Sequence, residues 1–147
     1  MKLDLGCGEN RHEGFVGMDK RQLDTVDILH DIEEIPYPIK DESCDEIIAS
    51  HIMEHVKPWI TVDIFNELWR IMKPEGLLEI SVPYAGSPAY WQDPTHCNGF
   101  IPVTFEYFDP TRTLWSVYKP KPWLLEKGYP RYKDANLECV MRKVNEA

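Results

Sequence analysis

The feature that most constrains the fold is a short apolar run that leads directly into a glycine turn, Lys2-Leu3-Asp4-Leu5-Gly6-Cys7-Gly8. A second apolar run follows and ends in a carboxylate, Gly14-Phe15-Val16-Gly17-Met18-Asp19. Glycine lets the backbone approach a ligand closely, and an acid at the end of the next strand accepts hydrogen bonds from ribose hydroxyls. The two runs therefore predict an α/β sheet with a nucleoside pocket at its edge.

The spacing of this turn does not match a dinucleotide site. Arg11 occupies the position of the third glycine, and Asp19 comes earlier than the usual separation of about 20 residues. The chain also lacks the Gly-Lys-Ser/Thr loop that binds phosphates. The pattern favours an adenosine-like group without a phosphate cradle, although a lone Gly-x-Gly also fits an ordinary tight turn.

Later segments extend the pattern. The segment Asp27–Ile32 has a short apolar run and carries the acid Asp31 near its end. A second run, Asp45–His51, follows it and continues into Ile52–Val56. Glu67–Gly76 and Leu77–Pro83 come next. In this order the segments resemble the class I S-adenosylmethionine-dependent methyltransferases, over roughly residues 2–110. Glu75 stands where that family often has glycine.

This resemblance implies an α/β, Rossmann-like, mostly parallel sheet of seven strands in the order 3-2-1-4-5-7-6, with the last strand antiparallel, in a single domain spanning 1–147. We expect helices over 58–73 and 102–109, because Pro58 and Pro102 suit first helical positions and apolar residues recur at helical spacing. The expected strands are 2–5, 15–19, 27–31, 45–50, 76–82, 113–118 and 136–144.

The connections between the early strands are short. Segments 6–14 and 20–26 lack room for an average helix of about 11–12 residues with its turns, and 32–44 carries Pro36 and Pro38. Apolar and polar residues also alternate in 77–82 and 137–142, which indicates one buried and one wetter face. The chain therefore resembles a minimal member of the family, with helices mainly on one face. We expect the other face to be bare or covered by a partner, such as a second copy in a homodimer.

The resemblance also assigns the residues that bind the cofactor. Gly6 to Gly8 would contact its methionine and ribose parts, Asp19 would accept from the ribose hydroxyls, and Asp31 would accept from the adenine amino group beside the Ile32 amide. Asn10 and Arg11 are close enough in sequence to reach the methionine carboxylate, although an exposed surface arginine is an equal alternative for Arg11. The full predicted set is Asp4, Gly6, Cys7, Gly8, Asn10, Arg11, Asp19, Lys20, Asp31, Ile32, Ser50 and His51.

A long loop of aromatic and polar residues, 83–96, follows the fifth strand. Loops of this length inside a compact domain are usually functional. Its Asp93-Pro94-Thr95-His96 run resembles a subset of the family. We therefore predict that Asp93 and His96 grip or deprotonate the methyl acceptor, together with His51 at the tip of the fourth strand. The alternative is that Asp93 caps a turn and His96 binds backbone groups.

One motif points to different chemistry. His51-Ile52-Met53-Glu54-His55 reads H-x-x-E-H, the inverted zinc-peptidase motif. Those enzymes carry it inside a long helix, whereas here it follows a strand directly and Pro58 comes soon after. We therefore predict no metal site, and a zinc hydrolase that uses His51, Glu54 and His55 remains an alternative.

Composition limits the acceptor. The chain has 147 residues, a formal net charge of −9 and four scattered cysteines. An acidic protein seldom binds nucleic acid, and unpaired cysteines are typical of a cytoplasmic protein. We expect a methyltransferase for a small-molecule or glycan-like acceptor, not bound to membranes. A subunit that binds S-adenosylmethionine and needs a partner to recognise the acceptor is the alternative.

Overall fold

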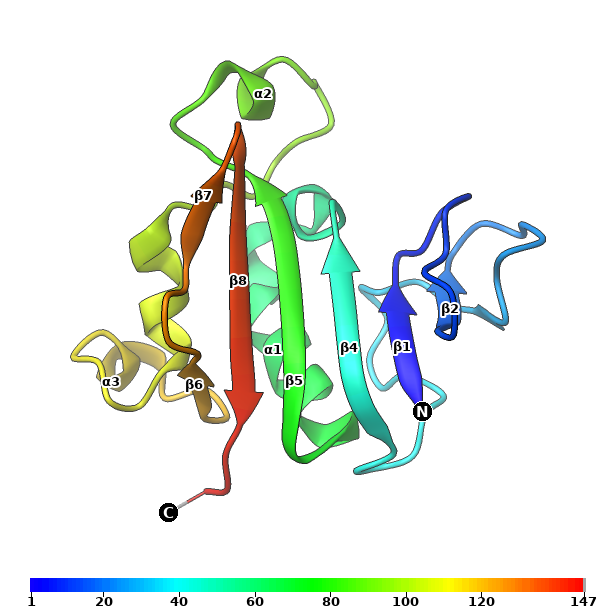
Figure 1. The fold of residues 1–147 in the computed structure, drawn as a ribbon, viewed down its shortest axis with the longest axis horizontal. Helices are drawn as coiled ribbons and strands as arrows, with labels where there is room; N and C mark the ends of the chain where they lie inside the picture. Colours follow the sequence, from blue (N-terminus) through cyan, green and yellow to red (C-terminus); the bar gives the residue numbers. More distant parts are fainter. Residues whose placement is uncertain (147) are drawn as a thin grey trace.

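The computed structural model describes residues 1–146 as one mixed sheet with few helices (Figure 1). Its strands are β1 (Lys2–Leu5), β2 (Val16–Asp19), β3 (Ile28–Leu29), β4 (Cys44–Ser50), β5 (Met72–Pro83), β6 (Trp123–Leu125), β7 (Arg131–Lys133) and β8 (Asn136–Lys143). Its α-helices are α1 (Thr61–Ile71), α2 (Pro88–Trp91) and α3 (Trp115–Tyr118), and its 3-10 helices are η1 (Met53–His55), η2 (Pro58–Ile60) and η3 (Pro102–Phe108).

The strand order is β3-β2-β1-β4-β5-β8-β6. The first five strands pair in parallel, and β8 pairs antiparallel with β5. Both β6 and β7 pair with β8, β6 opposite Met141–Lys143 and β7 opposite Asn136–Glu138. The sheet therefore has eight strands in seven positions, because β6 and β7 share one edge, and the predicted order is confirmed.

The strand expected at 113–118 is wrong. Those residues contain α3, and the edge strands lie later, in β6 and β7. The physical reason is burial: Trp123 is fully buried in the core, whereas Val117 and Tyr118 are exposed. The Trp115 indole instead donates to the Pro120 carbonyl at 3.1 Å and closes a local turn.

The expected helices are present but shorter. The predicted helix 58–73 begins with the 3-10 turn η2 and continues as α1 to Ile71, and the next two residues already belong to β5. The expected helix 102–109 is the 3-10 helix η3, which ends at Phe108.

Helices cover one face of the sheet. Figure 1 shows α1 behind the sheet and no helix in front of β4, β5 and β8. Phe65 of α1 stacks on Phe108 of η3, with ring centroids 3.8 Å apart, so η3 lies on the same face. On β5, Leu78 and Ile80 are buried while Leu77 is 39% exposed. Within residues 1–146 the prediction of helices mainly on one face is confirmed.

The parallel strands bring their carboxyl ends to one edge. β1, β4 and β5 run in the same direction in Figure 1, and the loop that carries α2 extends beyond their ends. Ligands of open α/β sheets bind at this edge. None of the helices in residues 1–146 is both long and apolar enough to cross a membrane.

Candidate active site

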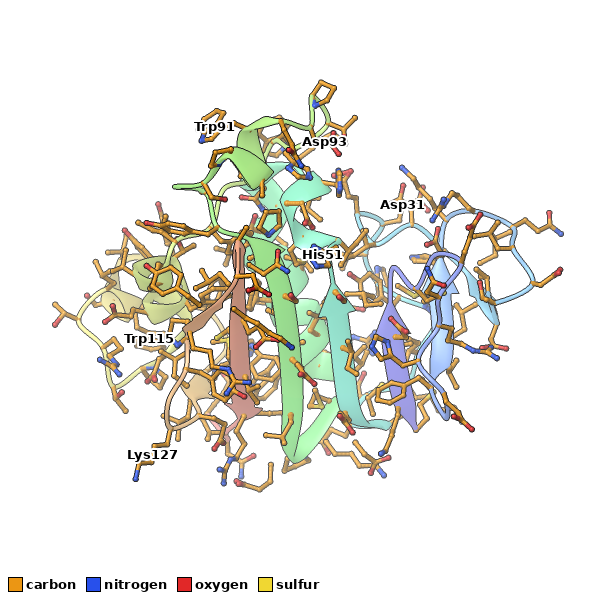
Figure 2. All side chains as sticks on the ribbon, turned by 45° about the horizontal axis from the view of Figure 1, so that its top comes forward. Asp31, His51, Trp91, Asp93, Trp115 and Lys127 are labelled. Carbon is orange, nitrogen blue, oxygen red and sulfur yellow. The ribbon has the colours of Figure 1, made fainter. Side chains whose placement is uncertain are left out.

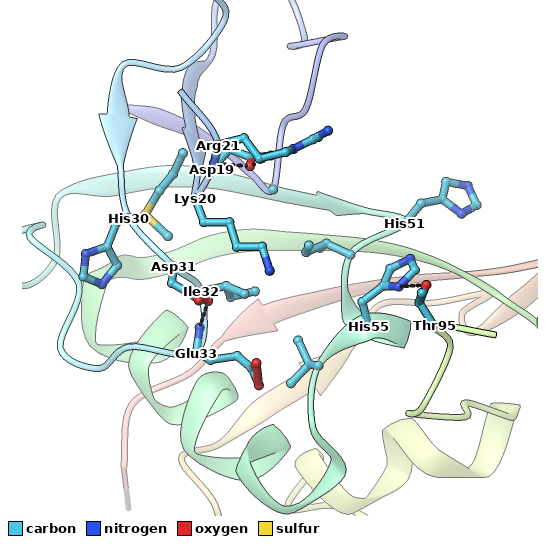
Figure 3. Close-up of a pocket in the computed structure, with 14 residues that line it drawn as sticks. Asp19, Lys20, Arg21, His30, Asp31, Ile32, Glu33, His51, His55 and Thr95 are labelled. Atoms are coloured by element: carbon cyan, nitrogen blue, oxygen red, sulfur yellow. Dashed lines mark hydrogen bonds and ion pairs between the residues drawn. The ribbon is translucent and has the colours of Figure 1, made fainter. Parts of the chain in front are cut away.

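A pocket of about 460 Å³ lies beyond the carboxyl ends of β1, β2, β3 and β4 (Figure 3). It brings together residues that follow five strands, β1 to β5, as the open sheet predicts. Of the residues predicted to bind the cofactor, those that line this pocket are Gly6, Asp19, Lys20, Asp31, Ile32 and His51.

The pocket floor depends on glycine at residue 6. Gly6 has φ +67°, and a Cβ there would lie 2.6 Å from Cγ1 of Ile52. A side chain at this position would therefore collide with the turn after β4 and enter a backbone region that favours glycine. The Gly6 turn thus leaves open backbone next to the pocket, which is the space that a close-fitting ligand needs.

Asp19 is the last residue of β2 and is 8% exposed. Its Oδ2 accepts from the Gly8 amide at 2.9 Å, and its Oδ1 accepts from the Arg21 amide at 2.9 Å and from Arg21 Nε at 3.4 Å. Burial acts to raise the pKa of Asp19, but these hydrogen bonds outweigh it and hold the pKa below its ordinary value. A carboxylate has about four acceptor positions, so Oδ2 keeps one for a ligand hydroxyl.

Asp31 and Ile32 form the wall opposite Asp19. Asp31 Oδ1 accepts from the Glu33 amide at 2.9 Å, and the buried Tyr37 hydroxyl donates to the Ile32 carbonyl at 2.8 Å. These bonds fix the loop after β3 and leave Asp31 half-buried at the pocket. Figure 3 shows the Lys20 side chain reaching into the space between Asp31 and His55.

Three of the other residues predicted to bind the cofactor, Asp4, Cys7 and Arg11, make contacts that hold the loop after β1. Asp4 accepts from the amide and Nδ1 of His12, both at 2.8 Å, and Arg11 pairs with Asp27 at 2.7 Å. Cys7 Sγ lies 3.8 Å from the Thr25 carbonyl oxygen. Contact of Arg11 with the methionine carboxylate stays a prediction. The residues of the predicted set that do not line the pocket are Asp4, Cys7, Gly8, Asn10, Arg11 and Ser50.

The opposite end of the pocket is formed by the turn after β4. His51 has φ +55° and contributes to the wall. Its Nδ1 lies 3.5 Å from Oε2 of the buried Glu54. This carboxylate raises the pKa of His51, against the opposing effect of burial.

The loop after β5 lies against this turn. Thr95 Oγ1 and His55 Nδ1 are 3.1 Å apart, and both residues line the pocket. His96 lies behind them: its Nδ1 is 2.6 Å from the Tyr90 carbonyl oxygen, and its ring centroid is 4.8 Å from that of His55. Figure 2 shows Asp93 on this loop, above the end of β4 where His51 lies.

The sequence prediction therefore missed His55 and Thr95, which line the pocket next to His51. Both positions carried a signal, because they lie inside the H-x-x-E-H and Asp-Pro-Thr-His motifs. The prediction chose His96 over Thr95, whereas the structure brings Thr95 to the pocket and places His96 behind it.

The residues at the pocket fit an adenosine-type cofactor. The Gly6 turn provides close backbone approach, and Asp19 and Asp31 provide two acceptors at opposite walls. Asp19 is kept ionised by amide hydrogen bonds, so it is ready to accept from a diol.

Comparison with known proteins agrees with this geometry. Residues 11–80 match the model of a methyltransferase domain family. No curated protein matches the sequence.

Solved structures share the fold at low identity. A SAM-dependent methyltransferase from Archaeoglobus fulgidus is 16% identical, with a TM-score of 0.70 over 97% of this chain and 85% of that one. The 1,6-didemethyltoxoflavin-N1-methyltransferase of Burkholderia thailandensis, with bound 1,6-didemethyltoxoflavin and S-adenosylhomocysteine, is 13% identical, with a TM-score of 0.66 over 98% of this chain and 71% of that one.

A third match is a chain of a Haloferax volcanii complex that contains the Trm112 methyltransferase activator. It is 14% identical, with a TM-score of 0.67 over 99% of this chain and 82% of that one. The methyltransferase-domain match over residues 11–80, the strand order and the pocket of Gly6, Asp19 and Asp31 together support a class I S-adenosylmethionine-dependent methyltransferase, an enzyme whose cofactor is S-adenosylmethionine.

Proposed function

We propose that the chain transfers a methyl group to a small-molecule or glycan-like acceptor. The observation that carries this proposal is the composition of the end of the pocket formed by the turn after β4 and the loop after β5, which is lined by the polar residues His51, His55 and Thr95. The formal net charge of −9 disfavours a nucleic acid acceptor. The Burkholderia relative, whose structure contains 1,6-didemethyltoxoflavin, supports an acceptor of small size.

The residues would act mainly by positioning. When bound, S-adenosylmethionine supplies a methyl group that is already activated on a sulfonium. Asp19 and Asp31 would fix the nucleoside, and alignment of an acceptor near His51 would contribute about 7–11 kcal/mol through proximity and orientation. For a hydroxyl or protonated amine acceptor, His51 is the candidate base because it lines the pocket, and it would take the proton on a ring nitrogen.

Asp93 and His96 remain candidates for gripping or deprotonating the acceptor. Asp93 Oδ2 lies 3.6 Å from His96 Nε2, and its Oδ1 accepts from Thr95 Oγ1 at 2.7 Å. Through Thr95, which lines the pocket, the pair would set the position of the wall. We expect His96→Ala to lower kcat while the dissociation constant of S-adenosylhomocysteine stays near the parent value. Equal loss of both would assign His96 to cofactor binding or to the fold.

Two measurements test the proposal. Calorimetry with S-adenosylhomocysteine should show binding that Asp19→Ala and Asp31→Ala weaken. A methyl-transfer screen of small molecules, glycans, RNA and DNA should then find turnover among the first two classes. Turnover with nucleic acid alone would contradict the proposed acceptor class.

A second candidate function is a cofactor-binding subunit that needs a partner to recognise its acceptor. The bare face of the sheet favours it, since Leu77 is 39% exposed there and Val140 is half-buried. The Haloferax complex with a methyltransferase activator adds support. Binding of S-adenosylhomocysteine without turnover by the chain alone would favour this candidate. Light scattering would show whether a homodimer covers the face.

A further inference from the structure

Glu54 is a buried acid without a hydrogen-bond partner. Glu54 is 1% exposed, and neither of its carboxylate oxygens has a hydrogen-bond partner within residues 1–146. The contact with His51 Nδ1, at 3.5 Å, is an ion-pair contact only. Burying a carboxylate is unfavourable unless it is paired, hydrogen-bonded or bound to a metal. His51 contacts only Oε2, and neither oxygen has a hydrogen bond, so Glu54 has acceptor capacity for a further ligand of positive charge.

Two imidazoles stand beside this carboxylate. Glu54, His55 and His96 each offer one ligand atom, and the three atoms lie within 4.8 Å of one another. Glu54 and His55 come from η1, and His96 comes from the loop after β5. The cluster therefore joins two segments that are about 40 residues apart in sequence. The hydrogen bond between Thr95 and His55 joins the same two segments.

Hydrogen bonds fix the tautomers of both histidines. The Tyr90 carbonyl can only accept, so His96 Nδ1, at 2.6 Å, carries the proton. Thr95 donates its hydroxyl proton to Asp93 Oδ1 at 2.7 Å, and its oxygen therefore accepts from His55 Nδ1 at 3.1 Å. In the neutral form of each ring Nε2 is then the nitrogen without a proton, and that of His96 also lies 3.6 Å from Asp93 Oδ2. A metal-binding histidine usually has this arrangement, with its second nitrogen donating to an oxygen.

We infer that Glu54, His55 and His96 form a binding site for a divalent transition-metal ion, with zinc as the ion that fits best. Two imidazoles and one carboxylate form the ligand set of catalytic zinc sites that keep an open position. Mg²⁺ and Ca²⁺ prefer oxygen ligands, so the two histidines disfavour them. Zinc bonds of about 2.1 Å require the ligand atoms to draw together, and the exposed His55 ring has room to turn.

The site differs from the one that the H-x-x-E-H motif suggests. That motif pairs His51 with His55 on a long helix, whereas η1 is a single 3-10 turn and His96 replaces His51 in the cluster. Because His55 and Thr95 line the pocket, an open metal position would face the acceptor. There the ion would bind an acceptor oxygen or nitrogen and lower its pKa, a role that rests on the proposed function. Metal binding itself does not depend on that function.

Titration with zinc chloride alone tests the site. The full chain, first treated with a chelator and then dialysed, is titrated by calorimetry, and we expect one ion per chain. Glu54→Gln and His55→Asn should each lose more than the roughly 10–100-fold in affinity that outer-shell changes cost. His30→Asn is the matched control, because His30 lines the same pocket away from the cluster and should keep the parent affinity.

Thermal unfolding gives a second readout. Zinc should raise the Tm of the parent chain and of His30→Asn but not that of Glu54→Gln, whose metal-free form should be at least as stable as the parent because it no longer buries a charge. His55→Asn carries the test if Glu54→Gln does not fold, since His55 is exposed. Absence of zinc binding by the parent, or equal binding by both ligand variants, would overturn the inference. Binding of S-adenosylhomocysteine to the same metal-free samples reports on the methyltransferase function separately.

Discussion

The two halves of the sheet are stabilised by different means. Around β4, β5 and β8 the core is aromatic and apolar: Phe65 stacks on Phe108, and Trp123 is fully buried. Around β1, β2 and β3 the sheet also buries apolar side chains, such as Leu3 and Met18, but the loops that connect these strands contain no helix and are held by aspartates. Asp4, Asp19 and Asp27 accept from the amides of His12, Gly8 and Gly17 at 2.8–2.9 Å.

This difference shows how a nucleoside pocket can be built without the usual helices. A carboxylate that accepts backbone amides fixes a loop locally, and at Asp19 the same carboxylate forms the pocket wall. Arg11 adds cover, because its Cδ lies 3.0 Å from where a Cβ of Gly17 would be. In this half the residue that holds the fold also lines the pocket, whereas the buried aromatic residues Phe65, Phe108 and Trp123 of the other half do not line it.

The strongest test removes the largest buried side chain of the apolar half. Trp123→Ala should lower the free energy of unfolding by about 3–5 kcal/mol, because it leaves a cavity where the indole packed. The dissociation constant of S-adenosylhomocysteine for the folded protein should not change. Denaturant unfolding and calorimetry measure the two effects.

Trp59→Ala is the control for Trp123→Ala. Trp59 is 77% exposed, so its removal should change stability by no more than about 0.5 kcal/mol. Similar losses in the two variants would show that the apolar core is not the main support of this half.

A second test addresses the aspartate half through Asp19→Asn. The amide side chain cannot accept on both sides, so the Gly8 or the Arg21 amide loses its partner. Hydrogen bonds to charged groups contribute about 1.5–3 kcal/mol, and we expect cofactor affinity to fall about tenfold or more together with stability. Calorimetry with S-adenosylhomocysteine and denaturant unfolding measure both.

Asp27→Asn is the matched comparison for Asp19→Asn. Asp27 accepts from Gly17 at 2.8 Å but does not line the pocket. Its substitution should affect stability more than affinity. Equal losses of affinity in the two variants would refute the direct role of Asp19.

Much of this arrangement was predictable because it follows from local chemistry. The glycine turn, the acid at Asp19 and the short connections predicted the pocket and the uncovered face, whereas the strand order came from the family resemblance. The position of the edge strand was not predictable, since residues 113–118 and 123–125 both contain Trp and apolar residues. Only packing against Phe65, whose carbonyl accepts from Trp123 Nε1 at 3.4 Å, decides which tryptophan is buried. In the same way, no spacing rule brings His96 next to Glu54, because some 40 residues, including α1 and β5, separate them.

The dependence of fold stability on pH should also differ between the two halves. Burial acts to raise the pKa of Asp19 but amide bonds lower it, and the Gly17 amide, with Arg11, lowers the pKa of Asp27. A carboxylate with a lowered folded pKa stabilises the fold above its unfolded pKa of about 3.9, and this contribution is lost as pH falls through the folded value. Stability should therefore decline as pH falls below about 4. Asp27→Asn should show a shallower decline, whereas Trp123→Ala should keep the parent slope. Denaturant unfolding between neutral and acidic pH measures these slopes, and an unchanged slope in Asp27→Asn would show that Asp27 does not contribute.

The smallest effect is expected at a turn outside both networks. Glu75 has φ +67°, a left-handed conformation that is unfavourable for residues other than glycine, and it lies near the start of β5, away from the pocket. Glu75→Gly should raise the free energy of unfolding by about 1 kcal/mol or less, because relief of backbone strain is partly offset by the greater freedom of glycine in the unfolded chain. Glu75→Ala removes the exposed ion pair with Arg142, at 3.5 Å, without relieving the strain, so it should be less stable than Glu75→Gly. Both variants should bind S-adenosylhomocysteine with the parent affinity. A loss of affinity would mean that the apolar half is coupled to the pocket after all.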